Sequence, residues 1–316
     1  MTTRGRVDGR AAHMTEEFAS YYNRRILKPP TWREVNIGGY LYLGGLAGAS
    51  SVFAAGGQLT GRPALARVGK VAALAGITLS LVALVEDLGR PARFVNMLRT
   101  FKPTSPMNMG SWLLAAYAPL AGVSALCDLT GKLPLVGRAA CYGAAVIGPA
   151  ITTYTAVLVS DTAVPAWHEG HREMPFLFAG SATATAAGAA LIATPRSENA
   201  PARRAAVLGA ALELAAGRLM RRRIGMIAES YERGRAGSLL RAAEALALAG
   251  TAGALVAGRS RALALLSGAA FMAGSACLRL GVFSAGVAST EDPRYTVVPQ
   301  RNRLSAASQD RDRQYA

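Results

Sequence analysis

Long apolar stretches alternate along the chain with short segments that carry most of the charged side chains. The stretch 35–61, for example, contains no charged residue. A helix needs about 20 mainly apolar residues to cross the hydrocarbon core of a membrane. The alternation therefore predicts an all-α polytopic membrane protein, a bundle of eight transmembrane helices. The predicted spans are 35–61, 71–85, 103–127, 139–160, 174–194, 205–217, one that begins near 239, and 262–289.

These spans divide the chain into three parts: a polar N-terminal tail (1–34), the transmembrane domain (35–289) and a polar C-terminal tail (290–316). The N-terminal tail has several basic residues but no apolar core segment, so we do not expect a signal peptide there. The C-terminal tail is too short and too polar to form a core of its own, and we expect it to contact a partner or to be disordered.

The net charge of +16 and the pI near 10.6 would, in a soluble protein, first suggest nucleic acid. Here 51% of the residues are hydrophobic and only 17% are charged, below the roughly 25% of ordinary globular chains. We therefore expect no nucleic-acid partner and a chain in contact with membrane lipids. The three cysteines are an odd number and lie in or at apolar stretches, which excludes a secreted disulfide-rich protein.

An even number of spans places both termini on one side of the membrane. We call this side A; it also holds the loops 86–108, 161–174 and 218–238, and the other loops form side B. Side A has the excess of Lys and Arg, so the positive-inside rule makes it cytoplasmic. The cluster Arg218–Arg223 is expected to set this topology and to contact anionic lipids. The preference for Arg over Lys suggests a bacterial protein, and hence the bacterial cell (inner) membrane.

The chain has few residues that could ligate a redox metal. Its three histidines are His13, in the tail, and His168 and His171, in one loop, whereas a haem in a helical bundle generally takes a histidine from each of two facing helices. The cysteines do not have the spacing of an iron–sulfur site. We therefore predict that this chain holds no haem, no iron–sulfur cluster and no other metal, and that any redox chemistry depends on electrons from a partner.

Polar motifs gather on side A and, as a set, carry a resemblance. The first helix reads Trp32, then an aromatic and Leu-rich stretch into Leu-Gly-Gly-Leu-Ala-Gly (43–48), and the next loop reads Asp-Leu-Gly-Arg-Pro-Ala-Arg-Phe (87–94). Ser-Pro-Met-Asn-Met-Gly-Ser-Trp (105–112) follows, and Thr-Tyr (153–154) lies in the fourth span, ahead of Pro-Ala-Trp (165–167). Over residues 31–185 the sequence resembles the NrfD/PsrC family, the membrane subunits of polysulfide-reductase-type complexes.

The resemblance implies a quinone-binding membrane anchor without haem. Such a subunit passes electrons between a membrane quinone, here most simply menaquinone, and a four-cluster ferredoxin-like iron–sulfur subunit linked to a molybdenum- or tungsten-containing catalytic subunit. The family's quinone-binding positions correspond to Asn36, Tyr40 and Tyr154, and Tyr40 stands where some relatives have His. The same residues also have structural interpretations, as a helix N-cap for Asn36 and an interfacial anchor for Tyr40.

Quinone chemistry requires protons to move with the electrons, so the ionisable groups on side A are candidates for proton transfer. Asp87 lies at the end of a span, where it can order the loop and lie close to the quinone. Asp161 and His168 follow the fourth span, and His titrates near neutral pH, although a solvated loop His is an equally simple interpretation.

Two ionisable residues are predicted inside spans, which makes them functional candidates because a charge in lipid is costly. Glu213 is predicted either to take part in proton transfer or to form a structural ion pair with Arg279.

Five residues on side A are predicted to contribute to docking of the partner subunit: Trp32, Arg90, Arg93, Trp112 and Trp167. Two other functions stay open at this point. The intramembrane ionisable residues would also suit a secondary transporter, and a purely structural membrane anchor would keep the fold without the quinone site.

Overall fold

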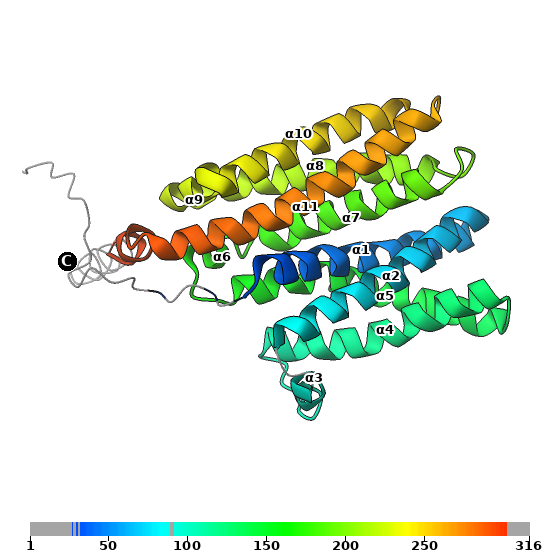
Figure 1. The fold of residues 1–316 in the computed structure, drawn as a ribbon, viewed down its shortest axis with the longest axis horizontal. Helices are drawn as coiled ribbons and strands as arrows, with labels where there is room; N and C mark the ends of the chain where they lie inside the picture. Colours follow the sequence, from blue (N-terminus) through cyan, green and yellow to red (C-terminus); the bar gives the residue numbers. More distant parts are fainter. Residues whose placement is uncertain (1–26, 28–29, 31, 89–91, 302–316) are drawn as a thin grey trace, which may run out of the picture.

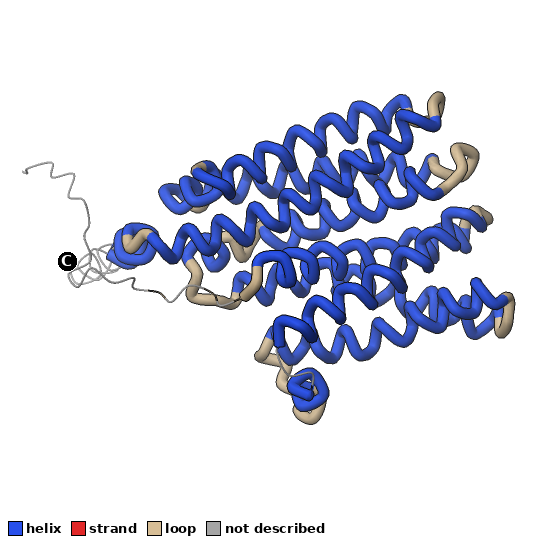
Figure 2. The backbone as a smooth tube through the Cα atoms, in the orientation of Figure 1, coloured by secondary structure: helices blue, strands red, loops and turns tan. Residues whose placement is uncertain are grey.

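The computed structural model describes residues 27, 30, 32–88 and 92–301, except for the side chains of 88 and 92–94. Within these residues the protein is helical and has no strand (Figures 1 and 2). The long helices are α1 (Glu34–Leu59), α2 (Pro63–Leu88), α4 (Pro106–Thr130), α5 (Pro134–Ser160), α7 (Met174–Ala193), α8 (Ala200–Arg223), α10 (Gly234–Val256) and α11 (Arg261–Glu291). The short helices are α3 (Ala92–Met97), α6 (Pro165–Glu169), the 3-10 turn η1 (Gly225–Ala228) and α9 (Glu229–Glu232).

The eight long helices confirm the all-α, polytopic membrane fold. In the described part of the chain, seven of them are long and apolar enough to cross a membrane. The remaining long helix, α8, carries Glu213 and a basic C-terminal turn, and it is not apolar enough to be counted with these seven. It nevertheless packs against α7 and α10 as a member of the bundle.

The helices pack as antiparallel neighbours. Contacts join α1 with α2, α4 with α5, α7 with α8, and α10 with α11. In Figure 1 these pairs form two groups, with α2, α4 and α5 on one side and α7, α8, α10 and α11 on the other. Helix α1 contacts α2 and α5 as well as α7 and α11, so it joins the two groups at the centre of the bundle.

Small residues let α1 pass close to α5. A Cβ atom added at Gly48 would lie 2.5 Å from the carbonyl oxygen of Gly148, and one at Gly148 would meet the carbonyl of Gly48 equally closely. Only glycine at both positions permits this backbone contact, which is the usual reason for small residues at interfaces between membrane helices. The glycines of the first span therefore serve close packing between helices.

The second predicted span is too short by two turns at its start. Helix α2 begins at Pro63, so Arg67 and Lys70 belong to the helix and not to a side B loop. Both side chains reach Asp128 near the end of α4, with Arg67 Nε 3.0 Å from Oδ2 and Lys70 Nζ 2.8 Å from Oδ1. Because these ion pairs compensate the charges of Arg67 and Lys70, both residues can lie within the helix, ahead of the uncharged stretch that begins at residue 71.

Helix α4 begins with local signals that the sequence carries. Ser105 is its N-cap and accepts a hydrogen bond from the backbone N–H of Asn108, and Pro106 occupies the first turn, where it sacrifices no helical hydrogen bond. The helix ends at Gly131, whose φ of 69° lies in the left-handed region that glycine adopts without strain.

Candidate functional site

A cavity of about 90 Å³ lies between the side A ends of α1, α2, α4 and α5. Its polar lining consists of the hydroxyls of Tyr40, Tyr154 and Ser111 and the carboxylate of Asp87. The rest of the wall is apolar: Trp32, Ile37, Leu41, Leu84, Met97, Met107, Gly110, Leu114, Leu158 and Val159. A few convergent polar groups in an apolar pocket are typical of a site for a small organic ligand.

Tyr40 and Tyr154 point toward each other across this cavity. Their hydroxyl groups, which come from α1 and α5, are joined by a hydrogen bond, and both side chains are buried. A hydroxyl group can donate one hydrogen bond and accept others. Because the two hydroxyls are each other's partner here, one can turn to donate to a ligand oxygen while the other continues to support it. Two of the four predicted quinone contacts therefore meet at one point.

The ring of Tyr154 needs Gly110 beside it. A Cβ atom added at Gly110 would lie 2.5 Å from Cε2 of Tyr154, well inside van der Waals contact. Gly110 belongs to the Ser-Pro-Met-Asn-Met-Gly-Ser-Trp motif. The glycine of this motif leaves room for the ring of Tyr154. The adjacent Ser111 also lines the cavity and was not predicted. It donates to the carbonyl of Met107, so no local pattern distinguished it from an ordinary helical serine.

Asp87 holds two helix ends together and also lines the cavity; its predicted place close to a quinone stays a prediction. Its carboxylate accepts a hydrogen bond from the backbone N–H of Arg33 at 3.3 Å, which ties the end of α2 to the residue that precedes α1. The same side chain lines the cavity. The neighbouring Arg90 lies outside the described residues, and so does the side chain of Arg93.

Asn36 does not line the cavity. The face of α1 that does carries Ile37, Tyr40 and Leu41, and Asn36 is half-buried outside this wall. The register of α1 places Asn36 outside this wall, and its predicted role in quinone binding stays a prediction. Residues 36 and 40 lie on roughly the same side of a helix, because they are four positions apart. Which face of α1 lines the cavity is decided by how α1 packs against its neighbours.

The segment between α2 and α4 is held in place by Asn108. Its side-chain oxygen accepts from the backbone N–H of Lys102 at 2.7 Å, and its amide nitrogen donates to the carbonyls of Met97 and Thr100 at 2.7 and 3.0 Å. Trp112 adds a hydrogen bond from its indole nitrogen to the carbonyl of Thr100. This tether keeps Met97 at the wall of the cavity.

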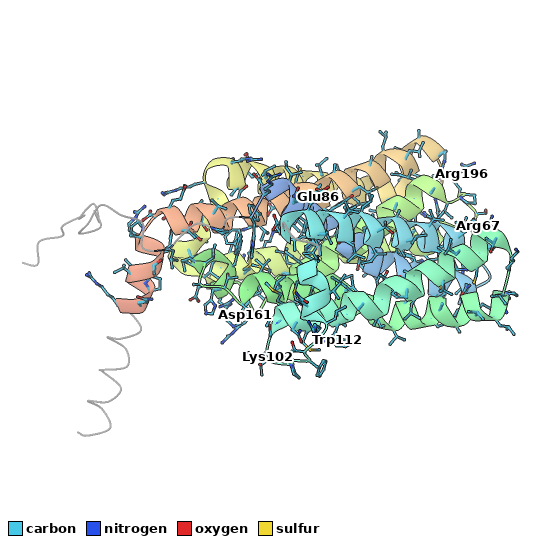
Figure 3. The ribbon with its side chains drawn as sticks, turned by 60° about the horizontal axis from the view of Figure 1, so that its bottom comes forward. Arg67, Glu86, Lys102, Trp112, Asp161 and Arg196 are labelled. Atoms are coloured by element: carbon cyan, nitrogen blue, oxygen red, sulfur yellow. The ribbon has the colours of Figure 1, made fainter. Side chains whose placement is uncertain are left out.

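Of the predicted docking residues, Trp167 belongs to the core. It is 1% exposed, its indole nitrogen donates to the carbonyl of Val282 at 2.8 Å, and its ring packs against Phe283 and Trp32. The prediction that it forms a docking surface is corrected, because α11 and the segment before α1 cover it. Trp112, by contrast, is 38% exposed beside Phe101 and remains accessible to a partner or to lipid (Figure 3).

Asp161 and His168 are exposed and do not line the cavity. Asp161 follows the last residue of α5, and His168 lies in α6 with its ring nitrogen Nδ1 3.3 Å from the carbonyl oxygen of Ser160. Figure 3 shows Asp161 well away from the end of the bundle that carries Arg67 and Arg196. Both predicted proton carriers are thus in contact with solvent on side A.

Glu213 and Arg279 are both buried, but they do not form a direct ion pair in the described part of the protein. Arg279 instead lies over the ring of Phe178, 3.6 Å from its centroid, and donates to the carbonyl of Phe178 at 3.0 Å. The two groups, on α8 and α11, still lie close enough for their charges to interact, so a structural pairing without direct contact stays a prediction. A backbone carbonyl and an aromatic face take the place of the expected carboxylate, since both favour a guanidinium.

A second polar contact inside the first group of helices was not predicted. The hydroxyl of Tyr117 lies 2.5 Å from that of Ser51 and 2.6 Å from the carbonyl oxygen of Ala47. Tyrosine and serine in apolar spans give no sequence signal that they face each other, since that depends on how α1 and α4 pack.

Comparison with known proteins gives one clear relationship. The family model described as "Polysulphide reductase, NrfD" matches residues 27–228, more than half of the chain. The match includes α1, α2, α4 and α5, whose side A ends form the cavity. No curated protein matches the chain at a significant level.

Proposed function

Because the chain belongs to the NrfD family, we propose that it is the quinone-binding membrane subunit of an oxidoreductase complex. The quinone head lies in the cavity between α1, α2, α4 and α5. The observation that carries this proposal is the pair of buried tyrosine hydroxyls, Tyr40 and Tyr154, which face each other in an otherwise apolar wall. A planar ring with carbonyl oxygens needs such a combination of apolar surface and a small number of hydroxyl donors.

A bound quinone supplies a carrier of two electrons and two protons. Within this chain, Tyr40 and Tyr154 orient the quinone: one hydroxyl donates to a quinone oxygen, and the other supports that hydroxyl. Asp87, at the edge of the cavity, holds a proton at its carboxylate and passes it between the cavity and side A. Asp161 and His168, both exposed on that side, exchange protons with the solvent.

The electrons come from, or go to, a partner on side A. We propose a four-cluster ferredoxin-like iron–sulfur subunit, behind which a molybdenum- or tungsten-containing enzyme acts. Trp32 and Trp112, with Arg90 and Arg93 in the adjoining segment, form its docking surface. Menaquinone is the proposed quinone, the bacterial inner membrane the proposed location, and the cytoplasm the proposed compartment of side A.

Replacing Tyr154 by Phe tests this proposal. The change removes one hydroxyl and leaves the ring that fills the space beside Gly110. A lost hydrogen bond to a neutral ligand is worth about 0.5–1.5 kcal/mol, so we expect several-fold weaker quinone binding by the purified complex and loss of quinone-coupled turnover. Tyr142→Phe, a more exposed tyrosine on the same helix, is the matched control.

Assembly with the partner must be unchanged in both variants, since Tyr154 is buried away from the surface. Quinone binding and turnover that are equal in Tyr154→Phe and the parent chain would contradict the proposed site. A loss of assembly in Tyr154→Phe would instead assign the tyrosine a structural role.

A further inference from the structure

A larger cavity lies at the opposite, side B end of the same four helices. It has a volume of about 500 Å³ and is formed by the ends of α1 and α2 and by the turn between α4 and α5. Figure 3 shows Arg67 at this end of the bundle. The basic and acidic side chains in its wall are Arg62, Arg67, Lys70, Arg138 and Asp128. Four cations and one anion leave the cavity with an excess of three positive charges.

The single carboxylate is already shared by two of the cations. Lys70 Nζ lies 2.8 Å from Asp128 Oδ1 and Arg67 Nε lies 3.0 Å from Oδ2. Lys70 is only 5% exposed, so this charge is held inside the protein and aimed at the cavity. Arg62 and Arg138 form no ion pair with any residue that the structure describes. The cavity therefore has cationic groups available for an anion.

The start of α5 adds to this positive potential. Helix α5 begins at Pro134 beside the cavity, and Leu133, its N-cap residue, provides no side-chain cap. The N-terminus of α2 is different, because Glu198 accepts from the backbone N–H groups of Ala64 and Leu65 at 2.9 and 3.1 Å. An uncapped helix N-terminus favours a negative charge nearby. The basic side chains and the N-terminus of α5 thus lie at the same cavity.

We propose that this cavity binds a phosphate-bearing anion, the headgroup of an anionic phospholipid. The location supports a lipid, because the cavity lies where transmembrane helices end. Its lining combines the basic groups with the ring of Tyr142, which is 37% exposed and offers apolar surface next to the headgroup. Arginine side chains suit phosphate oxygens because their planar donors bind two oxygens at once. Free phosphate has the same chemistry, and the experiment distinguishes it.

The test uses the purified full chain, stripped of lipid in a mild detergent, and follows thermal unfolding. Phosphatidylglycerol is added in one arm, phosphatidylcholine in the second, and inorganic phosphate at matched ionic strength in the third. We expect phosphatidylglycerol to raise the melting temperature by several degrees and the other two to have little effect, since a ligand that binds only the folded state stabilises it.

The variant Arg62→Gln with Arg138→Gln removes the two unpaired cations and spares the Lys70–Asp128 contact. We expect it to melt like the parent chain in phosphatidylcholine and to lose most of the shift with phosphatidylglycerol. Arg62→Lys with Arg138→Lys should recover part of it. The matched control is Lys132→Gln with Arg204→Gln, which removes two exposed charges outside the cavity wall.

Equal stabilisation of the double Gln variant and the parent by phosphatidylglycerol would overturn the proposal. So would equal stabilisation of the parent chain by phosphatidylcholine, because it would show a non-specific lipid effect. A shift with inorganic phosphate and none with phosphatidylglycerol would overturn the assignment to a lipid headgroup.

Discussion

At the scale of single residues, the side A cavity depends on a few side chains whose positions are set by close neighbours. Tyr154 is the clearest example, since its hydroxyl meets Tyr40 and its ring occupies space that Gly110 leaves free. The sequence identified Tyr40, Asp87 and Tyr154 as candidates, and all three line one cavity. It could not identify Ser111 or exclude Asn36, because both depend on which face of a helix turns inward.

Gly110→Ala should move the ring of Tyr154 without removing any polar group. The added Cβ would lie 2.5 Å from Cε2 of that ring. Forcing a methyl group into a packed site costs about 1–3 kcal/mol, so we expect a several-fold to a hundred-fold loss of quinone affinity, measured by titration of the purified complex. The control is Gly122→Ala on the same helix, where nothing lies within 4 Å of the added atom. Equal affinity in the two variants would contradict the packing argument.

An ion pair between the buried Glu173 and the exposed Arg223 on side A gives the protein a defined dependence on acid pH. Glu173, just before α7, receives two hydrogen bonds from the guanidinium of Arg223 at the end of α8, both 2.6 Å long. The hydrogen bonds from Arg223 hold the pKa of the Glu173 carboxyl below its ordinary value of 4.5. A lowered carboxyl pKa adds stability above the ordinary value, and this stability disappears as the pH falls through the pKa of the folded protein.

Glu173→Gln should therefore lower the melting temperature at pH 7 and have progressively less effect as the pH falls below about 4.5. Hydrogen bonds between charged groups are worth about 1.5–3 kcal/mol, which sets the expected loss at neutral pH. Thermal unfolding in detergent from pH 3.5 to pH 7 measures it. Glu232→Gln, at an exposed glutamate, should show no such dependence; an equal effect at all pH values would contradict the role of the Arg223 pair.

At the scale of helices, a close approach of two backbones joins α1 to α5. Gly48 of α1 and Gly148 of α5 face each other with no room for a side chain. The sequence predicted the long helices in the right order, because apolar length is a local property, but the sixth span, 205–217, covers only part of α8 (Ala200–Arg223). It misplaced the start of α2, since Lys70 and Arg67 find their partner on α4, and no local pattern could show that their charges are compensated.

Gly48→Ala should separate α1 from α5 and destabilise the fold. We expect a loss of about 1–3 kcal/mol, the usual effect of overpacking, visible as a lower melting temperature in detergent. Gly56→Ala on the same helix is the control, since its Cβ would meet nothing within 4 Å and alanine is the better helix former. If Gly48→Ala melts at or above the parent temperature, the α1–α5 contact does not require glycine.

At the scale of the whole molecule, the two ends of the bundle differ in chemistry. Side A has the small apolar cavity with its tyrosines and Asp87, and side B has the larger basic cavity around Asp128. Both cavities are formed by α1 together with α2, α4 and α5. The buried Glu213 and Arg279 belong to α8 and α11, on the other side of the bundle. This chemical difference arises because the same four helices present different residues at their two ends.

Purification of the tagged chain from native membranes in mild detergent should recover a complex. We expect an iron–sulfur protein, molybdenum or tungsten, and close to one quinone per chain, because the proposed quinone site needs a partner that supplies or accepts electrons. Protein identification, metal analysis and quinone extraction measure these. A chain recovered without iron or quinone would contradict the proposed function.

The sequence by itself determined the fold class, the membrane location and the family, because apolar length and contiguous motifs are properties that a chain carries locally. It also indicated Tyr40, Asp87 and Tyr154. Only the tertiary structure decided that Trp167 is core, that Arg279 packs over the ring of Phe178, and that basic residues from α2 and α5 share a cavity. These properties depend on which helix faces meet, and helix packing brings together residues that lie far apart in the chain.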